Sequence, residues 1–184
     1  VDLALNASEC IEIDYFPLPH VIDSKHAIKE NSAQVCPEVE KNIAINWKAN
    51  SSAGVEELFE IADQIVDLTI QNSRIVTNPM EPRGLVADWN KDTGRYTLYG
   101  SSQNIHVMAN YVASMLGVAD ALVRFIAPDV GGGFGSKNFC YTEYGLIAWM
   151  SKRLRRPVKW IASRSEGFLS DHQGRDHQSG RISA

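Results

Sequence analysis

Residues 128–138 read PDVGGGFGSKN and place four glycines within five positions, at 131, 132, 133 and 135. Each glycine loses more conformational freedom on ordering than any other residue. Holding this backbone in one conformation therefore has a high cost in conformational entropy. Such a backbone is useful where main-chain N–H groups must approach an anion or an oxo group without interference from Cβ atoms. The large apolar side chain of Phe134 could then form one wall of the space. The pattern indicates a binding loop.

Two common phosphate-binding loops do not match this segment. A P-loop requires Gly-Lys-Ser/Thr, whereas Ser136 here separates Gly135 from Lys137. The glycine spacing also differs from the dinucleotide fingerprint G-x-G-x-x-G, and no acidic residue follows at the distance expected for a ribose contact. A simple turn between a strand and a helix uses glycine for its positive φ values, but it does not need four glycines around a phenylalanine.

The other titratable residues show no catalytic or metal-binding arrangement. Glu81, in the sequence MEPR, is interpreted as a turn or ion-pair carboxylate, and Glu143 as a solvent-facing or helix-capping residue. Cys140 follows the loop without a neighbour that would lower its pKa, which favours a small buried hydrophobic residue. The histidines at 106, 172 and 177 lack ligand spacing. No catalytic residue and no metal ligand is assigned.

Composition indicates a globular protein. Of the 184 residues, 44% are hydrophobic and 22% are charged, which suits one sizeable core or two small ones. The net charge of −4 argues against nucleic-acid binding, because the only basic cluster, at 152–159, is short. No apolar run reaches the roughly 18 to 20 residues that span a bilayer. Three cysteines without C-x-x-C spacing favour a reducing, cytoplasmic compartment over a zinc site or disulfides.

Periodicity and turn residues predict the elements that position the loop. Strands are predicted at 10–19, 42–47, 64–71, 85–90, 95–102, 121–130 and 157–161, and helices at 24–31, 51–62, 105–116, 142–154 and from Ser163. Asp-Thr-Gly at 92–94 makes a hairpin of the fourth and fifth strands, and Gly117 ends the third helix. The order predicts an α+β fold of mixed strands and helices, with a boundary near residue 40.

Several motifs together resemble one family. NPMEPRG at 78–84, SSQNIH at 101–106, the GGGFGSK loop and RRPVKWIASRSEGF at 155–168 are similar to the large subunit of the molybdenum hydroxylases. This is the family of xanthine dehydrogenase, aldehyde oxidase and carbon monoxide dehydrogenase. With EIDYFPLP at 12–19, the resemblance runs through almost the whole chain and favours the carbon monoxide dehydrogenase-like branch.

The resemblance implies a molybdopterin-type molybdenum cofactor and a set of residues that would contact it. Gln103 matches the family glutamine whose side-chain amide lies beside the oxygen ligands of molybdenum. The loop matches the segment whose backbone amides contact a metal oxygen ligand and the pterin, at Gly132, Gly133, Phe134 and Gly135. Phe134 would also border the substrate channel. By this comparison, residues 1–40 end a small preceding α/β domain, and residues 41–184 begin the cofactor-binding domain.

The chain also departs from the family pattern. Large subunits are several times longer, and their glutamate general base lies beyond the stretch matched here. Purine-oxidising members carry a substrate-binding glutamate where this chain has Asn138, which disfavours xanthine as substrate. Because the chain is short and begins with Val rather than Met, it is interpreted as a fragment of a catalytic subunit that is inactive alone.

Three functional hypotheses follow. In the first, the complete enzyme hydroxylates an aldehyde or heterocycle, or oxidises carbon monoxide, and passes electrons to iron–sulfur and FAD subunits or domains. In the second, the chain is a truncated, non-catalytic binding or interaction subunit. In the third, a phosphate-binding enzyme of another family uses the glycine loop, although the loop fails the tests of both phosphate motifs.

Overall fold

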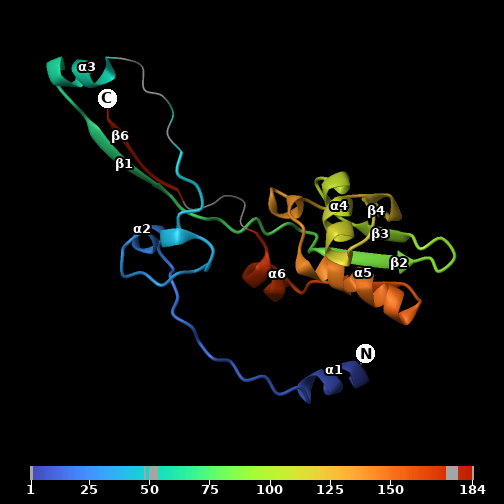
Figure 1. Cartoon of the computed structure of the whole chain (residues 1–184). Helices are drawn as coiled ribbons and strands as arrows, with labels where there is room; N and C mark the ends of the chain where they lie inside the picture. Colours follow the sequence, from blue (N-terminus) through green and yellow to red (C-terminus); the bar gives the residue numbers. More distant parts are fainter. Residues whose placement is uncertain (1, 48, 50–53, 173–177, 184) are drawn as a thin grey trace. The chain divides into compact units, whose positions relative to one another are not determined.

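The computed structural model describes residues 2–47, 49, 54–172 and 178–183. The chain divides into two compact units, Val1–Ile65 and Val66–Ala184. Figure 1 gives the order of the elements along the chain. The predicted boundary near residue 40 concerns the domains of the complete protein and stays a prediction. Among the described residues, no helix is long and apolar enough to cross a lipid bilayer.

The first unit contains short helical segments: α1 (Asp2–Glu9), α2 (Ser24–Ala27), the 3-10 turn η1 (Glu40–Asn42) and α3 (Val55–Ile61). The helices predicted at 24–31 and 51–62 are confirmed in shorter form. The strands predicted at 10–19 and 42–47 are wrong, because these segments have no pairing partner among the described residues. Alternation of apolar residues therefore did not suffice to form a strand there.

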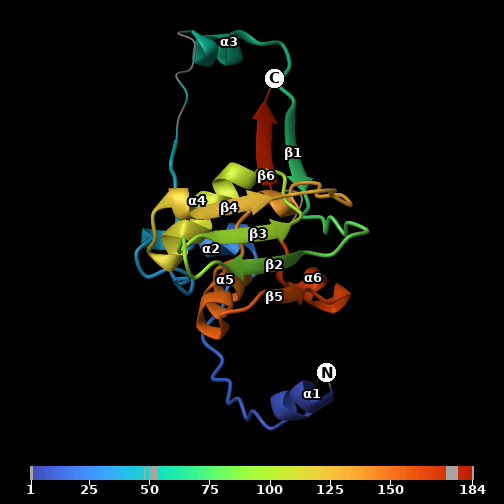
Figure 2. The same ribbon diagram turned by 90° about the vertical axis from the view of Figure 1, so that its right-hand side faces the viewer.

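The described residues of the second unit form two sheets. Strands β1 (Asp67–Asn72) and β6 (Gln178–Ser183) form an antiparallel pair. Four further strands pair in the order β4-β3-β2-β5: β2 (Gly84–Trp89), β3 (Tyr96–Gly100), β4 (Val123–Ile126) and β5 (Val158–Ile161). β2 runs antiparallel to both of its neighbours, whereas β3 and β4 are parallel (Figure 2). All five predicted strands of this unit are confirmed, whereas β6 was not predicted.

Helices α4 (Ile105–Leu116) and α5 (Thr142–Leu154) pack on one face of the four-stranded sheet. The core lies between this face and the two helices, and its most buried members include Leu85, Leu98, Met108, Val112, Tyr144 and Ala148. Shorter segments complete the unit: η2 (Asp120–Leu122), η3 (Ser136–Asn138) and α6 (Arg164–Ser170). The α+β prediction is confirmed.

Local residues explain where these elements begin and end. Asn90 Oδ1 accepts the N–H groups of Asp92 and Thr93, which closes the turn between β2 and β3. Asn104 caps α4 by accepting from the N–H of Val107. Gly117 ends α4 in the left-handed region at φ 65°, as predicted from its position after the last apolar residue.

Candidate cofactor site

The topology of the sheet brings three separate segments to one edge. Gln103 lies shortly after the end of β3, and the glycine loop follows the end of β4. Since β3 and β4 are parallel neighbours, both segments leave the sheet at the same edge. Strand β2 runs the opposite way, so Glu81, just before its start, reaches that edge too. Ligands of sheet proteins often bind outside the carboxyl ends of parallel strands.

The side chain of Gln103 is held by the backbone of the glycine loop. Its Oε1 accepts the N–H of Gly135 at 2.9 Å and the N–H of Lys137 at 3.2 Å. The backbone N–H of Gln103 donates to the carbonyl of Lys137 at 3.0 Å. Because the amide oxygen is bonded to the loop, the side-chain NH₂ group is the donor left for another group. Within the described residues, no acceptor is bonded to it.

Each glycine of the loop has a separate structural reason. A Cβ at Gly131 would lie 2.5 Å from the Cβ of Glu81, and one at Gly133 would lie 2.5 Å from Oε1 of Gln103. The other two adopt positive φ angles, 96° at Gly132 and 97° at Gly135, which favour glycine. The four glycines are thus explained by two close approaches and two left-handed backbone positions.

Three consecutive amides of the loop are available to a ligand. In the described part of the chain, the N–H groups of Gly132, Gly133 and Phe134 have no hydrogen-bond acceptor. Phe134 has a φ of 51°, and the residue is 68% exposed. The N–H of Gly135 is bonded to Gln103 instead, so a contact between Gly135 and a cofactor would have to share that donor. This set of neutral donors fits a group that presents oxygen atoms.

One carboxylate joins the two ends of the glycine loop. Oε2 of Glu81 accepts the N–H of Gly131 at 2.8 Å and pairs with Nζ of Lys137 at 2.7 Å. The predicted ion-pair role of Glu81 is confirmed. Partial burial raises the pKa of this carboxyl, but the bonds from Lys137 and Gly131 outweigh that effect and hold the pKa below its ordinary value.

Comparison with known proteins identifies the family to which this chain belongs. The sequence profile of the family described as the molybdopterin cofactor-binding domain matches residues 35–181. The chain belongs to this family. The resemblance stated from the motifs is confirmed, and the glycine loop and Gln103 lie inside the matched part of this cofactor-binding domain.

Relatives of this cofactor-binding domain are much longer than the chain. The large chain of carbon monoxide dehydrogenase from Hydrogenophaga pseudoflava is 31% identical over 195 aligned positions, covering 99% of this chain and 24% of the relative. The nicotine 6-hydroxylase large subunit of Paenarthrobacter nicotinovorans is 31% identical, covering 91% and 20%. The crystal structure of quinoline 2-oxidoreductase from Pseudomonas putida 86 superposes with a TM-score of 0.86 at 27% identity, covering 98% and 23%. The chain therefore spans between a fifth and a quarter of their length.

A buried arginine supports the loop of this cofactor-binding domain from behind. Arg83 is 1% exposed, and its Nε pairs with Asp171 at 2.5 Å. Its guanidinium lies 3.6 Å above the ring of Tyr141, whose hydroxyl donates to the carbonyl of Ser136 at 2.6 Å. Arg83 also pairs with Glu143 at 3.5 Å, which corrects the expectation that Glu143 faces solvent or caps its helix. No sequence pattern indicated this network.

The remaining candidate residues take structural roles. Burial raises the pKa of the Cys140 thiol to about 11, in agreement with a small hydrophobic residue. The ring of His172 stacks on Phe139 with 4.0 Å between centroids, and His106 lies on α4. His177 lies outside the described residues. Among the residues that the structure describes, no three His, Cys, Asp or Glu side chains are grouped to hold a metal ion.

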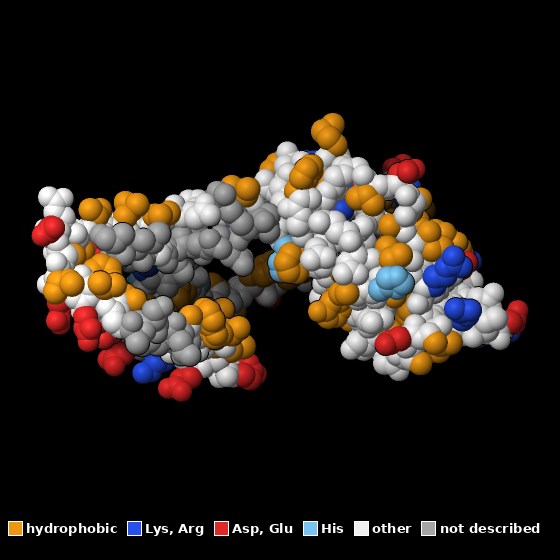
Figure 3. Space-filling view, turned by 90° about the horizontal axis from the view of Figure 1, so that it is seen from above, with side chains coloured by type: hydrophobic (Ala, Val, Ile, Leu, Met, Phe, Trp, Pro, Cys, Tyr) orange, Lys and Arg blue, Asp and Glu red, His pale blue; other side chains and the backbone are white. Residues whose placement is uncertain are grey.

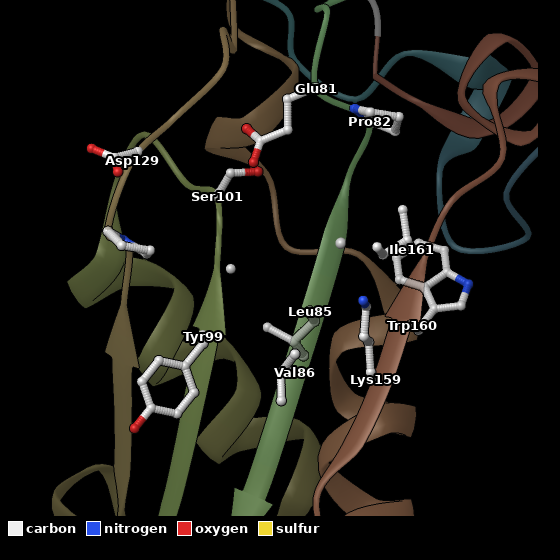
Figure 4. A pocket seen from close by; sticks show the side chains of 13 residues that line it. Glu81, Pro82, Leu85, Val86, Tyr99, Ser101, Asp129, Lys159, Trp160 and Ile161 are labelled. Carbon is white, nitrogen blue, oxygen red and sulfur yellow. The ribbon is translucent and has the colours of Figure 1, made fainter.

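A separate cavity of about 290 Å³ lies on the sheet face opposite the helices. In Figure 4, α4 and α5 lie behind the sheet, and Tyr99, Lys159 and Ile161 stand in front of it. Glu81 lies at one end of the cavity with its carboxylate directed toward Ser101. Neither Gln103 nor the triple glycine lines this cavity, so it is distinct from the donors described above.

Proposed function

We propose that this chain forms one wall of the molybdenum-cofactor site in the large subunit of a molybdenum hydroxylase. The observation that carries the proposal is the orientation of Gln103, whose amide oxygen is bonded to the loop so that its NH₂ group remains a donor. Membership in the molybdopterin cofactor-binding family supports the identity of the acceptor.

The residues of this chain would bind and orient the cofactor. Gln103 would donate to an oxygen ligand of the metal, and the amides of Gly132, Gly133 and Phe134 would provide further neutral donors. When bound, the cofactor supplies the oxygen-transfer and two-electron redox chemistry. Neutral donors can hold such oxygens in place without changing the net charge of the site. The exposed ring of Phe134 would border the path of the substrate.

The proposed reaction is hydroxylation of an aldehyde or a heterocycle, or oxidation of carbon monoxide. Relatives are named for carbon monoxide, nicotine and quinoline, of which the last two are nitrogen heterocycles. Because the relatives named above include a large chain and a large subunit, further subunits are expected, and iron–sulfur and FAD components would receive the electrons. The sparse, unpaired cysteines support a reducing, cytoplasmic compartment.

The test compares variants of the complete subunit made in cells that synthesise molybdenum cofactor. Gln103→Glu retains an oxygen for the N–H groups of Gly135 and Lys137, but it removes the NH₂ donor and adds a negative charge. Gln103→Ala removes both sides of the amide, and Asn110→Ala on the exposed surface of α4 is the control. Bound molybdenum is measured by elemental analysis of the purified protein.

We expect the alanine variant to retain roughly 2- to 10-fold less molybdenum, the loss equivalent to one hydrogen bond of about 0.5–1.5 kcal/mol. The glutamate variant should lose at least as much, because its charge repels oxygen ligands. Wild-type protein without molybdenum, or a glutamate variant with the full wild-type content, would contradict the proposal.

A second candidate is a binding subunit without catalytic activity. The observation in its favour is that Glu81, the carboxylate bonded to the loop, is paired with Lys137, so this carboxylate does not supply a free base at the loop. A complete protein that holds molybdenum but shows no oxidation of aldehydes, heterocycles or carbon monoxide would favour this candidate.

A further inference from the structure

We propose that Glu81 and Lys137 are positioning residues, which hold the glycine loop in the shape that makes Gln103 a donor. The inference rests on the proposed function for the identity of the bound group. The contacts that carry it are formed entirely by this chain. They link Glu81 to Lys137 and Lys137 to Gln103.

Lys137 contributes to this arrangement through both its backbone and its side chain. Its backbone is bonded to Gln103 in both directions, through its N–H at 3.2 Å and its carbonyl at 3.0 Å. Its side chain is fully buried and ends on Glu81 at 2.7 Å. A buried ammonium that loses its counter-charge is strongly disfavoured, and among the described residues Glu81 is the carboxylate paired with Lys137, so the side chain restricts where the backbone of residue 137 can lie. The rotation of the Gln103 amide thus depends on the Lys137 side chain, although the hydrogen bonds of Gln103 go to the Lys137 backbone.

Glu81 holds the other end of the loop through the same oxygen. Oε2 accepts the N–H of Gly131, and the N–H of Glu81 donates to the carbonyl of Gly131 at 3.2 Å. The first and last parts of the loop are therefore tied to one carboxylate, with the free amides of 132–134 between them. This arrangement fixes the width of the loop at the position where those amides must converge.

The segment that carries Glu81 is itself anchored. Arg164 at the start of α6 donates to the carbonyl of Pro79 at 2.6 Å and to the carbonyl of Met80 at 2.8 Å. Two residues after Glu81, Arg83 is buried and paired with Asp171. The chain on both sides of Glu81 is held in place. A substitution of the Glu81 carboxylate should therefore change the conformation of the glycine loop and should not be compensated by movement of the segment that carries Glu81.

The experiment measures hydrogen exchange of the backbone amides in the complete subunit produced without molybdenum cofactor. Glu81→Gln keeps the shape and an acceptor for Gly131, and it removes only the charge. Lys137→Met removes the ammonium and keeps the apolar stem. Ile147→Val in the core of α5 is the control, since it lowers stability without touching the loop. The double variant of Glu81 and Lys137 completes a cycle.

We expect either single variant to raise the exchange rate of the hydrogen-bonded amides 135–137 about 10-fold, relative to amides of α4 and α5. The control should leave this ratio unchanged. The exchange rate in the double variant should not exceed that in the single variants, because each single variant already removes the ion pair between Glu81 and Lys137. In cells that supply cofactor, the variants whose loop amides exchange faster should also contain less molybdenum than the wild-type protein.

Unchanged exchange at 135–137 in Glu81→Gln, or effects that add in the double variant, would overturn the inference. If Lys137→Met does not fold, Glu81→Gln alone decides the matter. A wild-type protein without molybdenum would reject the proposed function, and the exchange ratio would still decide whether the pair positions the loop.

Discussion

The close approach of Gly133 to Gln103 leads to a prediction at the scale of single residues. Gly133→Ala would place a methyl group 2.5 Å from the amide oxygen, so that either the loop or the glutamine must move. We expect a loss of stability of about 1–3 kcal/mol, as for other overpacked positions, together with a fall in bound molybdenum. Denaturant unfolding and elemental analysis measure the two effects.

The control for this substitution lies in α6. A Cβ at Gly167 would meet its nearest neighbour, Asp171 Oδ2, at 3.6 Å, which is an ordinary contact. Gly167→Ala should therefore leave molybdenum content unchanged and should not lower stability, because alanine favours helix. Equal loss in both variants would show that close packing at Gly133 has no special effect.

The pH dependence of stability follows from the lowered pKa of Glu81. A carboxyl whose pKa is lowered by folding stabilises the folded state above its unfolded pKa, and this contribution is lost as the pH falls through the folded pKa. The wild-type protein should thus be more stable than Glu81→Gln at neutral pH, and the difference should shrink below about pH 4.5. Chemical unfolding at several pH values measures the difference. A difference that grew on acidification would contradict the assignment of the charge.

Sequence reasoning reached some site residues but not others. The glycine loop was identified from its composition, Gln103 was found through a resemblance, and the interpretation of Glu81 as an ion-pair carboxylate came from its turn-like sequence. The partner of Glu81 was not found, because Lys137 lies 56 positions away and only the folded sheet brings the two together. Arg83 was missed for the same reason, since its partners come from other segments of the chain.

At the scale of elements, α4 lies in the sequence between Gln103 and strand β4, which precedes the glycine loop. The packing of this helix on the sheet can be tested. Met108 is fully buried against the sheet, whereas Met115 of the same helix is half exposed. Met108→Ala should cost about 2–5 kcal/mol because it leaves a cavity, and Met115→Ala should cost clearly less. Thermal and denaturant unfolding of both variants measure the difference. Equal losses would mean that α4 does not pack on the sheet as described.

The elements that were predicted correctly share a strong local signal. The hairpin of β2 and β3 has turn residues between β-rich segments, and α5 has helical periodicity that ends before Pro157. Strand β6 was missed because residues 175–184 carry few apolar residues, and pairing with β1 forms it nonetheless. The false strands at 10–19 and 42–47 show the opposite case, in which alternation exists but no described segment pairs with them.

At the scale of the whole molecule, apolar side chains remain at the surface in many places (Figure 3). Tyr99 and Ile161 are half exposed on the sheet face opposite the helices. Large exposed apolar surfaces promote association. We expect the 184-residue chain by itself to bind a hydrophobic dye and to associate in sedimentation experiments, and Ile161→Lys to weaken both effects. A dye-free, monomeric chain would contradict this expectation.

The parallel pairing of β3 and β4 also has a consequence for folding. The bond from Gly135 to Gln103 closes only 32 positions of chain, most of them within the strand–helix–strand unit. Short closures carry a small entropic cost and form early. The orientation of the Gln103 amide would then be set while the chain is still being synthesised. The sheet edge that carries Gln103 and the glycine loop would be formed before a ligand or another part of the protein binds to it.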